Sequence, residues 1–189
     1  IEEFMLLANR TVAEKIGRVP KGKKAKVLPY RIHDLPDPEK LDNLAQFIAR
    51  FGYKLRTSGT KTDISKSINH LLDDIQGKKE ENLIETVSIR AMQKARYSVH
   101  NVGHYGLAFD YYTHFTSPIR RYPDLQIHRI IKETLRGRMG EERRNHYEEI
   151  LPTVAEKTSE AERRADESER ETLKLKKAEY MEDHIGEEF

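Results

Sequence analysis

The chain has 189 residues, of which 37% are hydrophobic and 35% charged, which suits one helix-rich domain with a core or a large piece of a bigger one. Because it contains no Cys, disulfides and thiolate metal sites are excluded, and a reducing compartment, by default the cytoplasm, is expected. The formal net charge of +2 gives no argument for nucleic acid from the molecule as a whole, and no segment suggests a membrane.

The N-terminal segment predicts an amphipathic helix over residues 1–16, with a stop at Gly17. Its apolar side chains recur at helical spacing: Met5, Ala8, Val12 and Ile16. The helical pattern starts at the first residue without an initiator Met, so we expect the chain to be part of a longer protein. A basic loop over residues 22–26 then leads to a short strand or extended segment over residues 27–33.

Three helices are predicted in the middle of the chain. Asp37 is an N-cap before Pro38, and the helix that they begin is expected to end at Gly52. The next helix covers residues 63–75, and the third covers residues 80–94. The side chains expected on the inner faces of these helices are Leu41, Leu44, Ala45, Ile48, Phe51, Ile64, Ile68, Leu71, Leu72, Ile75, Leu83, Ile84, Val87, Ala91 and Met92.

The pattern then changes to β-branched and aromatic residues with glycines. Over residues 96–116 it predicts a pair of strands, or a strand and a loop. A helix is expected to begin at Ser117–Pro118 and end at Gly137, and a longer one to run from Pro152 to Asp183. An inner stripe of small residues is expected on the long helix: Ala161, Ala165, Ser168 and Thr172, continuing to Leu175. Together these elements predict an α+β fold, rich in helices, with a few short strands.

The stretch from His104 to Asp124 has the most unusual chemistry, because six aromatic residues, two histidines and two arginines surround a predicted helix start. Thr116 or Ser117 can cap this helix, and Arg120 then lies in its first turn beside unpaired backbone N–H groups. A helix N-terminus together with a guanidinium attracts a phosphate, and the neighbouring rings can stack on bases. The alternative is structural, with the rings in the core and an arginine paired with an aspartate.

This stretch resembles the signature of the RNase II/RNase R (VacB) family of 3′-to-5′ exoribonucleases, through its centre Thr-Ser-Pro-Ile-Arg-Arg-Tyr-Pro-Asp. Three more blocks resemble segments of that family in the same order: Glu2–Asn9, Tyr30–His33 and Ala161–Glu167. The version found here is closer to RNase R than to RNase II. Through this resemblance, residues 1–189 are identified as the C-terminal part of an RNB catalytic domain.

The resemblance implies processive, sequence-nonspecific hydrolysis of single-stranded RNA to nucleoside monophosphates. Arg120 matches the family arginine that holds the scissile or adjacent phosphate and stabilises charge in the transition state. Glu2 matches a glutamate that contacts the ribose of the terminal nucleotide, with a solvent-facing Glu3 as the alternative. Glu169 is the counterpart of a glutamate that some members carry in the last helix. Further RNA contacts are expected from Thr116, Ser117, Arg121 and Tyr105.

The family's magnesium chemistry needs a cluster of aspartates, and this sequence has none. Asp73–Asp74 lies on a predicted helix, and the histidines lack the spacing of a metal set, so no metal ligand is assigned within the chain. The resemblance therefore implies that Mg²⁺ is bound by the upstream half of the same domain. That half and the flanking OB-fold domains lie outside residues 1–189, and the chain alone is expected to be inactive.

Two other functions stay open at this point. A family member whose full-length form has lost its aspartates would bind RNA without cutting it, and the upstream sequence would decide between the two. A helical scaffold that binds protein would leave the aromatic and arginine-rich stretch without a purpose. A titration with single-stranded RNA separates this scaffold from the other two functions.

Overall fold

The structure is a computed structural model that describes residues 1–19 and 27–187. The basic loop predicted over residues 22–26 therefore lies outside the described residues. The chain divides into two compact units. The first unit comprises residues 1–32, 96–101 and 111–189, and the second comprises residues 33–95 and 102–110. In the part of the chain that the structure describes, no helix is long and apolar enough to cross a bilayer.

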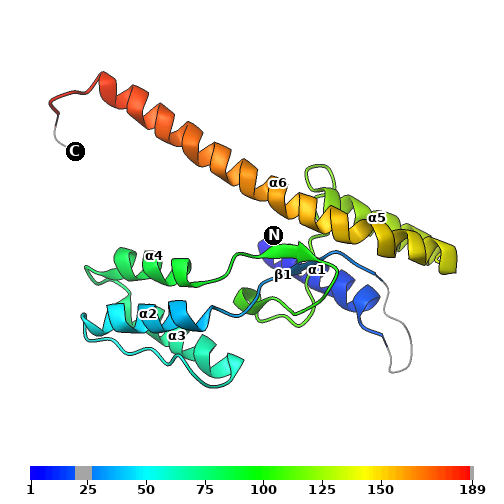
Figure 1. Cartoon of the computed structure of the whole chain (residues 1–189), viewed down its shortest axis with the longest axis horizontal. Coiled ribbons are helices and arrows are strands. Elements are labelled where there is room, and N and C mark those ends of the chain that lie inside the picture. The colour runs from blue at the N-terminus through cyan, green and yellow to red at the C-terminus, as the bar shows by residue number, and fades with distance from the viewer. Residues whose placement is uncertain (20–26, 188–189) are drawn as a thin grey trace. The chain divides into compact units, whose positions relative to one another are not determined.

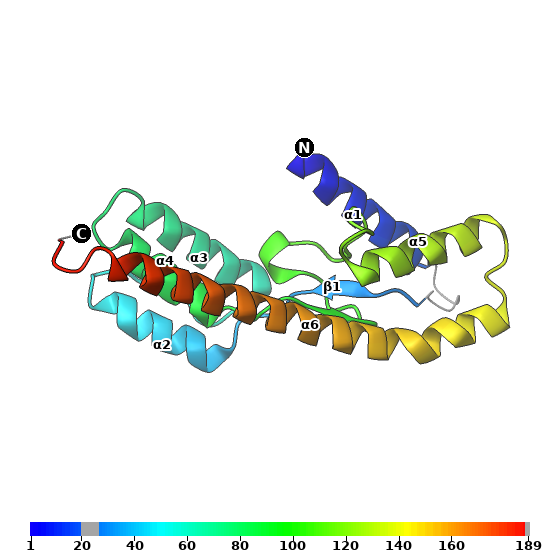
Figure 2. The ribbon, with the colours of Figure 1, turned by 90° about the horizontal axis from the view of Figure 1, so that it is seen from above.

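The first unit combines helices with a pair of short strands (Figures 1 and 2). Its elements are α1 (Glu2–Gly17), β1 (Tyr30–Ile32), β2 (Arg96–Ser98), α5 (Tyr122–Leu135) and α6 (Glu141–Glu182). The strands pair antiparallel, with Arg31 opposite Tyr97. β1 confirms the short strand predicted over residues 27–33, and β2 confirms the second alternative for residues 96–116, a strand and a loop. The core of this unit consists of Ala13, Ile16, Leu28, Tyr30, Ile32, Ile127, Ile130, Tyr147 and Leu151.

α1 confirms the predicted first helix, but its buried side differs from the predicted one. Asn9, Ala13 and Ile16 are buried, whereas Met5 is 38% exposed. The apolar pattern could not show that Asn9 is buried, because that pattern counts only hydrophobic residues. Gly17 ends the helix against Tyr30, and a Cβ at this position would overlap the Tyr30 hydroxyl.

α6 begins eleven residues before the predicted start and contains Pro152 in its interior. Its buried residues, Tyr147, Leu151 and Ala155, all lie in its N-terminal half. The predicted stripe of small residues is wrong, because all five of its side chains are exposed within the described chain. Small residues at helical spacing allow another element to come close to the helix. They do not by themselves bury enough apolar area to favour that packing.

The second unit packs three helices together (Figure 1). They are α2 (Pro38–Ala49), α3 (Lys61–Ile75) and α4 (Glu81–Ala91), followed by the short 3-10 turn η1 (Tyr105–Leu107). Their core contains Leu44, Ile48, Leu71, Ile75, Ile84 and Ala91. The three predicted helices are thus confirmed, and so is the α+β class of the whole chain.

Local capping chemistry explains where the helices of the second unit begin. The Asp37 carboxylate accepts the backbone N–H of Glu39 at 2.9 Å, which confirms the predicted N-cap. Thr60 and Asp63 form a capping box that starts α3 two residues earlier than predicted. Three side chains predicted to face inward are wrong, since Phe51 is 41%, Leu72 36% and Leu83 48% exposed.

Candidate functional site

The helix after the aromatic and arginine-rich stretch begins later than predicted. α5 starts at Tyr122, and residues 118–120 form a turn instead of its first turn. The cause is Pro123, which has no N–H to donate and whose ring would meet the carbonyl of the residue four positions earlier. A helix begun at Ser117–Pro118 would have to carry Pro123 in its interior, so the chain turns first and starts the helix beside the second proline.

This correction changes the roles of three predicted site residues. Thr116 and Ser117 do not cap α5, because its N-cap is Arg121, which has an extended backbone. Arg120 lies on the turn, and its backbone N–H donates to the Ser117 carbonyl at 3.3 Å. The phosphate corner expected from a helix N-terminus is therefore absent from residues 116–121 as described. What remains is an arginine on a hydrogen-bonded turn.

The buried carboxylate of Asp124 fixes this turn by hydrogen bonds. Asp124 is fully buried, and its Oδ2 accepts the backbone N–H of Ser117 at 2.8 Å. The same oxygen accepts Nε and Nη2 of Arg121 at 3.1 and 2.9 Å. Arg121 is thus engaged in the structural ion pair that the sequence left as an alternative, and its contact with RNA stays a prediction. Charge-assisted bonds to one buried oxygen fix both ends of the turn.

The segment before the turn is tied to α1 by one buried amide. The Asn9 Oδ1 accepts the backbone N–H of Phe115 at 2.8 Å, and its Nδ2 donates to the Tyr112 hydroxyl at 3.2 Å. Asn9 was not predicted to be a site residue. An Asn in a helix can simply face water, so only its burial shows that it needs partners elsewhere in the chain. This amide links the helix that carries Glu2 to the segment that leads to Arg120.

Two further contacts complete the support of the segment. The Thr113 hydroxyl donates to the Pro29 carbonyl at 2.6 Å in a buried bond. The His128 ring stacks on Phe115 with centroids 4.2 Å apart, and its Nε2 donates to the Phe115 carbonyl at 3.0 Å. We call Thr113, Phe115, Ser117 and Asp124 the base of the segment. Each of these residues is fixed to a neighbouring element by hydrogen bonds.

The turn itself presents its side chains outward. Ile119 is 102% exposed, Arg120 is exposed, and Tyr122 is 50% exposed. Within the described residues Arg120 forms no ion pair or side-chain hydrogen bond. We call Ile119 and Arg120 the tip of the segment. An unpaired guanidinium beside a half-exposed ring suits a phosphate and a stacked base, and Tyr122 is a candidate that the sequence analysis did not name.

The other predicted site residues lie at different places. Glu2 is exposed at the start of α1, and Glu169 is exposed on the C-terminal half of α6. The Thr116 hydroxyl oxygen is buried without a hydrogen-bond partner in the described chain. Tyr105 is only 7% exposed and belongs to the second unit. The stretch that the sequence presents as one corner is thus divided, since residues 104–110 fold with the second unit and residues 111–124 with the first.

A second polar network in the first unit joins the two strands to α6. Arg31 donates to the Glu162 carboxylate at 2.6 Å and stacks over the Tyr97 ring at 4.8 Å. The Tyr97 hydroxyl is 2.8 Å from His114 Nδ1. Burial, with the nearby Glu162 carboxylate as a lesser cause, raises the pKa of Tyr97 to about 12. The ring therefore stays neutral at any physiological pH. Its hydroxyl contact with His114 supports the segment over residues 113–124.

A metal centre was not expected in this chain. Within residues 1–19 and 27–187, no three His, Asp or Glu side chains lie close enough to hold a metal ion together. The magnesium that the resemblance implies is assigned to the upstream half of the domain, and the described residues offer no ligand set for it.

Comparisons with known proteins found relatives both in sequence and in structure. The family model for the RNB domain matches residues 1–137. Ribonuclease R 1 of Lactococcus lactis is 44% identical over 191 aligned positions, which cover 100% of this chain and 22% of the relative. A solved structure of Mycoplasma genitalium RNase R with ribose-methylated single-stranded RNA has a TM-score of 0.83 at 27% identity, covering 98% of this chain and 28% of that one.

A solved structure of yeast Ssd1, a pseudonuclease, is also similar. Its TM-score is 0.65 at 28% identity, and the match covers 83% of this chain and 18% of that one. The chain spans between a fifth and about a quarter of the length of the curated relatives it matches.

Proposed function

Since this chain belongs to the RNB domain family, we propose that it is part of a processive 3′-to-5′ exoribonuclease that hydrolyses single-stranded RNA to nucleoside monophosphates. Within that enzyme its role is to grip a phosphate with Arg120 and to form part of the wall of the RNA channel. The observation that carries the proposal is the contrast at residues 113–124, where a buried, hydrogen-bonded base supports an outward guanidinium that has no partner among the described residues.

The chemistry of Arg120 follows from its surroundings. A guanidinium offers a planar fork of N–H donors that can bind two oxygens of one phosphate. Charge on those oxygens grows as a phosphodiester is attacked, so a donor already in place stabilises the transition state more than the ground state. Because the backbone on both sides of the turn is fixed by Asp124, the Cα atom of Arg120 starts from a restrained position, and only its side chain has to be ordered when it binds a phosphate.

The remaining predicted contacts keep subordinate roles in this proposal. Glu2 accepts a hydrogen bond from the 2′-hydroxyl of the last nucleotide, which RNA has and DNA lacks. Ser117 and Thr116 contact the RNA backbone next to Arg120, while Arg121 contributes positive potential from its ion pair. Glu169 and Tyr105 complete the contacts. Since Tyr105 and the Thr116 hydroxyl are buried, their contacts are the two that the geometry supports least.

The metal belongs to another part of the enzyme in this proposal. Residues 1–189 are the C-terminal part of the RNB catalytic domain, and the aspartates that bind Mg²⁺ lie in its upstream half, with OB-fold domains flanking the whole. A bound Mg²⁺ would activate water and neutralise phosphate charge. The chain's own residues hold the substrate and do not supply that chemistry. The enzyme acts in the cytoplasm, which the absence of Cys supports.

A non-catalytic, RNA-binding member of the family is the alternative, and the similarity to the pseudonuclease Ssd1 is its support. The RNase R structures are more similar, with a TM-score of 0.83 against 0.65. The enzyme is therefore the better supported of the two.

The test is hydrolysis by the full-length protein that contains this chain. With 5′-labelled single-stranded RNA and Mg²⁺, we expect the full-length RNA to be converted to a short 5′-labelled end product with few intermediates. Chromatography of the unlabelled products should show nucleoside monophosphates. The 189-residue chain alone should release none at any Mg²⁺ concentration. RNA binding without hydrolysis by the full-length protein would favour the alternative, and release by the chain alone would mean that it contains a metal site.

A further inference from the structure

The exposed face of α5 presents a line of positively charged side chains. Arg129, Lys132 and Arg136 occupy positions i, i+3 and i+7 on and just after this helix, so they share one face, and all three are exposed. The buried face of α5 carries Ile127 and Ile130 into the core of the first unit, beside α6 (Figures 1 and 2). We call Arg129, Lys132 and Arg136 the basic stripe of α5.

The cations of the basic stripe have no acidic partner in the described part of the chain. None of them forms an ion pair or a side-chain hydrogen bond there. α5 contains two acidic residues, of which Asp124 is buried in the base of the segment and Glu133 pairs with no member of the stripe. Like charges spaced by three or four residues repel one another and weaken a helix. The stripe therefore calls for an anion from outside the chain.

Three exposed cations on α1 and α6 show the pattern expected of a solvated helix face. Each is paired with a carboxylate three or four residues away, at 2.6 to 2.8 Å: Arg10 with Glu14, Lys174 with Glu171, and Lys176 with Glu179. The helix dipole favours a cation in the last turn of α5 and so accounts for Lys132, but its effect does not extend to Arg129 in the middle of the helix. The fold of α5 by itself therefore does not explain the basic stripe.

The basic stripe starts from the turn that carries Arg120. Tyr122, the first residue of α5, is 50% exposed and lies seven residues before Arg129, so it occupies the same face of the helix. From Tyr122 to Arg136 the chain rises about 21 Å at 1.5 Å per residue. A row of cations thus leads away from the tip that is proposed to grip a phosphate.

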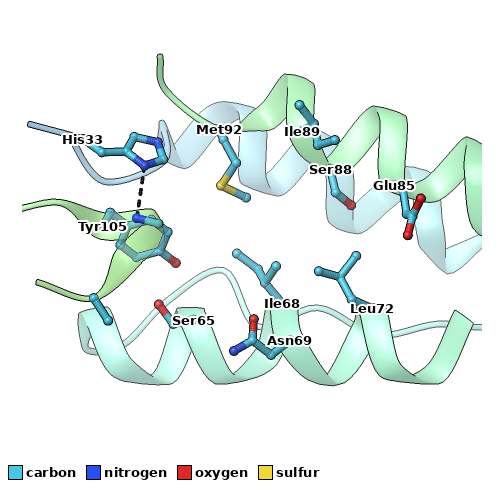
Figure 3. A pocket seen from close by; sticks show the side chains of 12 residues that line it. His33, Ser65, Ile68, Asn69, Leu72, Glu85, Ser88, Ile89, Met92 and Tyr105 are labelled. Atoms are coloured by element: carbon cyan, nitrogen blue, oxygen red, sulfur yellow. Dashed lines mark hydrogen bonds between the residues drawn. The ribbon is translucent and has the colours of Figure 1, made fainter. Parts of the chain in front are cut away.

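The pocket of the second unit offers no comparable surface. This pocket has a volume of about 430 Å³ and lies between α3 and α4, with Ile68, Leu72 and Met92 in its walls (Figure 3). No Lys or Arg occurs among the described residues that line it, and Glu85 adds a carboxylate. A phosphate backbone is therefore disfavoured there, whereas the cations of α5 suit one.

We propose that the basic stripe binds the sugar-phosphate backbone of the RNA strand whose 3′ end is held at Arg120, several nucleotides upstream of that end. This inference rests on the function proposed above, because its ligand is the substrate assigned there. Charge complementarity identifies the occupant, since phosphates recur along a single strand as the cations recur along the helix. Contacts of this kind supply affinity and register without reading sequence.

The test measures RNA binding by the full-length protein in a chelator, so that RNA is bound but not cut. Fluorescence anisotropy is recorded with single strands of about 4 and about 16 nucleotides. The triple variant Arg129→Gln, Lys132→Gln, Arg136→Gln should weaken binding of the longer strand at least about tenfold. It should also reduce the slope of log affinity against log salt by about 2, at about 0.7 for each lost contact. Binding of the shorter strand should change little, because that strand does not reach the stripe.

A matched control removes the same charge elsewhere in the chain. The triple variant Arg10→Gln, Lys174→Gln, Lys176→Gln loses three paired cations and should leave the binding of both strands unchanged. Hydrolysis with Mg²⁺ gives a second readout, because the stripe variant should raise KM more than it lowers kcat, whereas Arg120→Lys should lower kcat. The Tm of the stripe variant should not fall below that of the control, since the stripe has no partner to lose.

Two results would overturn the inference and leave the proposed function intact. One is full affinity for the longer strand in the stripe variant, and the other is an equal loss in the stripe and control variants, which would reflect net charge instead of a site. An equal loss for the shorter and the longer strand would also contradict it, because the stripe would then act at the 3′ end. If the unchanged protein binds neither strand, the proposed function fails and the inference with it.

Discussion

The tip and the base of the segment over residues 113–124 differ in almost every physical respect although they are adjacent in sequence. At the base, Asp124 is fully buried and accepts three hydrogen bonds through one oxygen. At the tip, Ile119 is 102% exposed and Arg120 is unpaired within the described chain. The base therefore stabilises the segment, and the tip carries the Arg120 guanidinium that is available to a ligand.

This difference separates two kinds of effect that a substitution can have. Changes in the base should lower the free energy of unfolding and affect activity only through the position of the turn. Changes at the tip should leave stability alone and act on activity directly. Arg120 and Arg121 are consecutive arginines that fall on opposite sides of this division, which makes them a natural pair for comparison.

The largest expected effect on stability comes from the buried carboxylate of the base. Asp124→Ala leaves Arg121 and the Ser117 N–H without their acceptor, and should lower the free energy of unfolding by about 3 kcal/mol. Urea unfolding followed by circular dichroism measures it. Asp42→Ala, on an exposed position of α2, is the control and should change stability by less than about 0.5 kcal/mol. Equal effects for the two variants would show that Asp124 does not support the turn.

The amide that ties α1 to the segment should come next. Asn9→Ala leaves the buried Phe115 N–H without an acceptor and the Tyr112 hydroxyl without its donor, which costs about 2 kcal/mol. The same unfolding measurement applies. Asn82→Ala, on an exposed position of α4, serves as the control. If Asn9→Ala unfolds no more easily than Asn82→Ala, the link between α1 and the base is not a source of stability.

The loss of folding stability at high pH tests the role of Tyr97, whose hydroxyl contacts His114. Because burial raises the pKa of Tyr97 to about 12, the unfolded chain loses this proton near pH 10 while the folded chain keeps it. Stability is thus retained below pH 10 and lost as pH rises toward 12. At pH 11 the loss amounts to about 1.4 kcal/mol per such tyrosine. Tyr30, with the same direction and size of shift, adds to it.

Thermal melting between pH 9 and pH 11 measures this loss of stability. Tyr97→Phe removes the ionisable group, so its Tm should start lower but decline less steeply than that of the unchanged chain. Tyr180→Phe is the control, because Tyr180 is 58% exposed. Parallel pH profiles for Tyr97→Phe and the unchanged chain would contradict the raised pKa.

The smallest expected effect is on the choice between RNA and DNA, and it rests on the proposed function. In the full-length enzyme, Glu2→Ala should reduce the ratio of hydrolysis rates for RNA and DNA 3′ ends several-fold, because the carboxylate no longer meets the 2′-hydroxyl. Stability should not change, since Glu2 is exposed. Glu3→Ala is the matched control. An unchanged ratio in Glu2→Ala together with a reduced one in Glu3→Ala would exchange the two assignments.

The sequence predicted elements better than it predicted burial. The N-cap at Asp37, the spacing of Leu41, Leu44 and Ile48, and the glycine stops are local signals, and the helices they predict are present. The stripe of small residues on α6 failed because helical spacing says which residues share a face and not what covers that face. Leu83, 48% exposed, failed for the same reason.

The candidate site shows a similar limit. The motif around Arg120 could be recognised from sequence, but the start of α5 could not be placed correctly without weighing Pro123 against Pro118. Asn9 and the division of residues 104–124 between two units depend on contacts far apart in the chain. The Asn9 amide meets Phe115 at a separation of 106 residues, which no local pattern encodes.

The central claim is that Arg120 serves the reaction while Arg121 serves the fold, and a paired substitution in the full-length enzyme tests it most directly. Arg120→Lys keeps the charge but loses the fork, so turnover should fall on the order of 100-fold with an unchanged Tm and nearly unchanged RNA affinity. Arg121→Lys should lower the Tm by several degrees, and activity should recover at lower temperature. Near-normal turnover in Arg120→Lys, or a Tm loss as large as that of Arg121→Lys, would contradict the account.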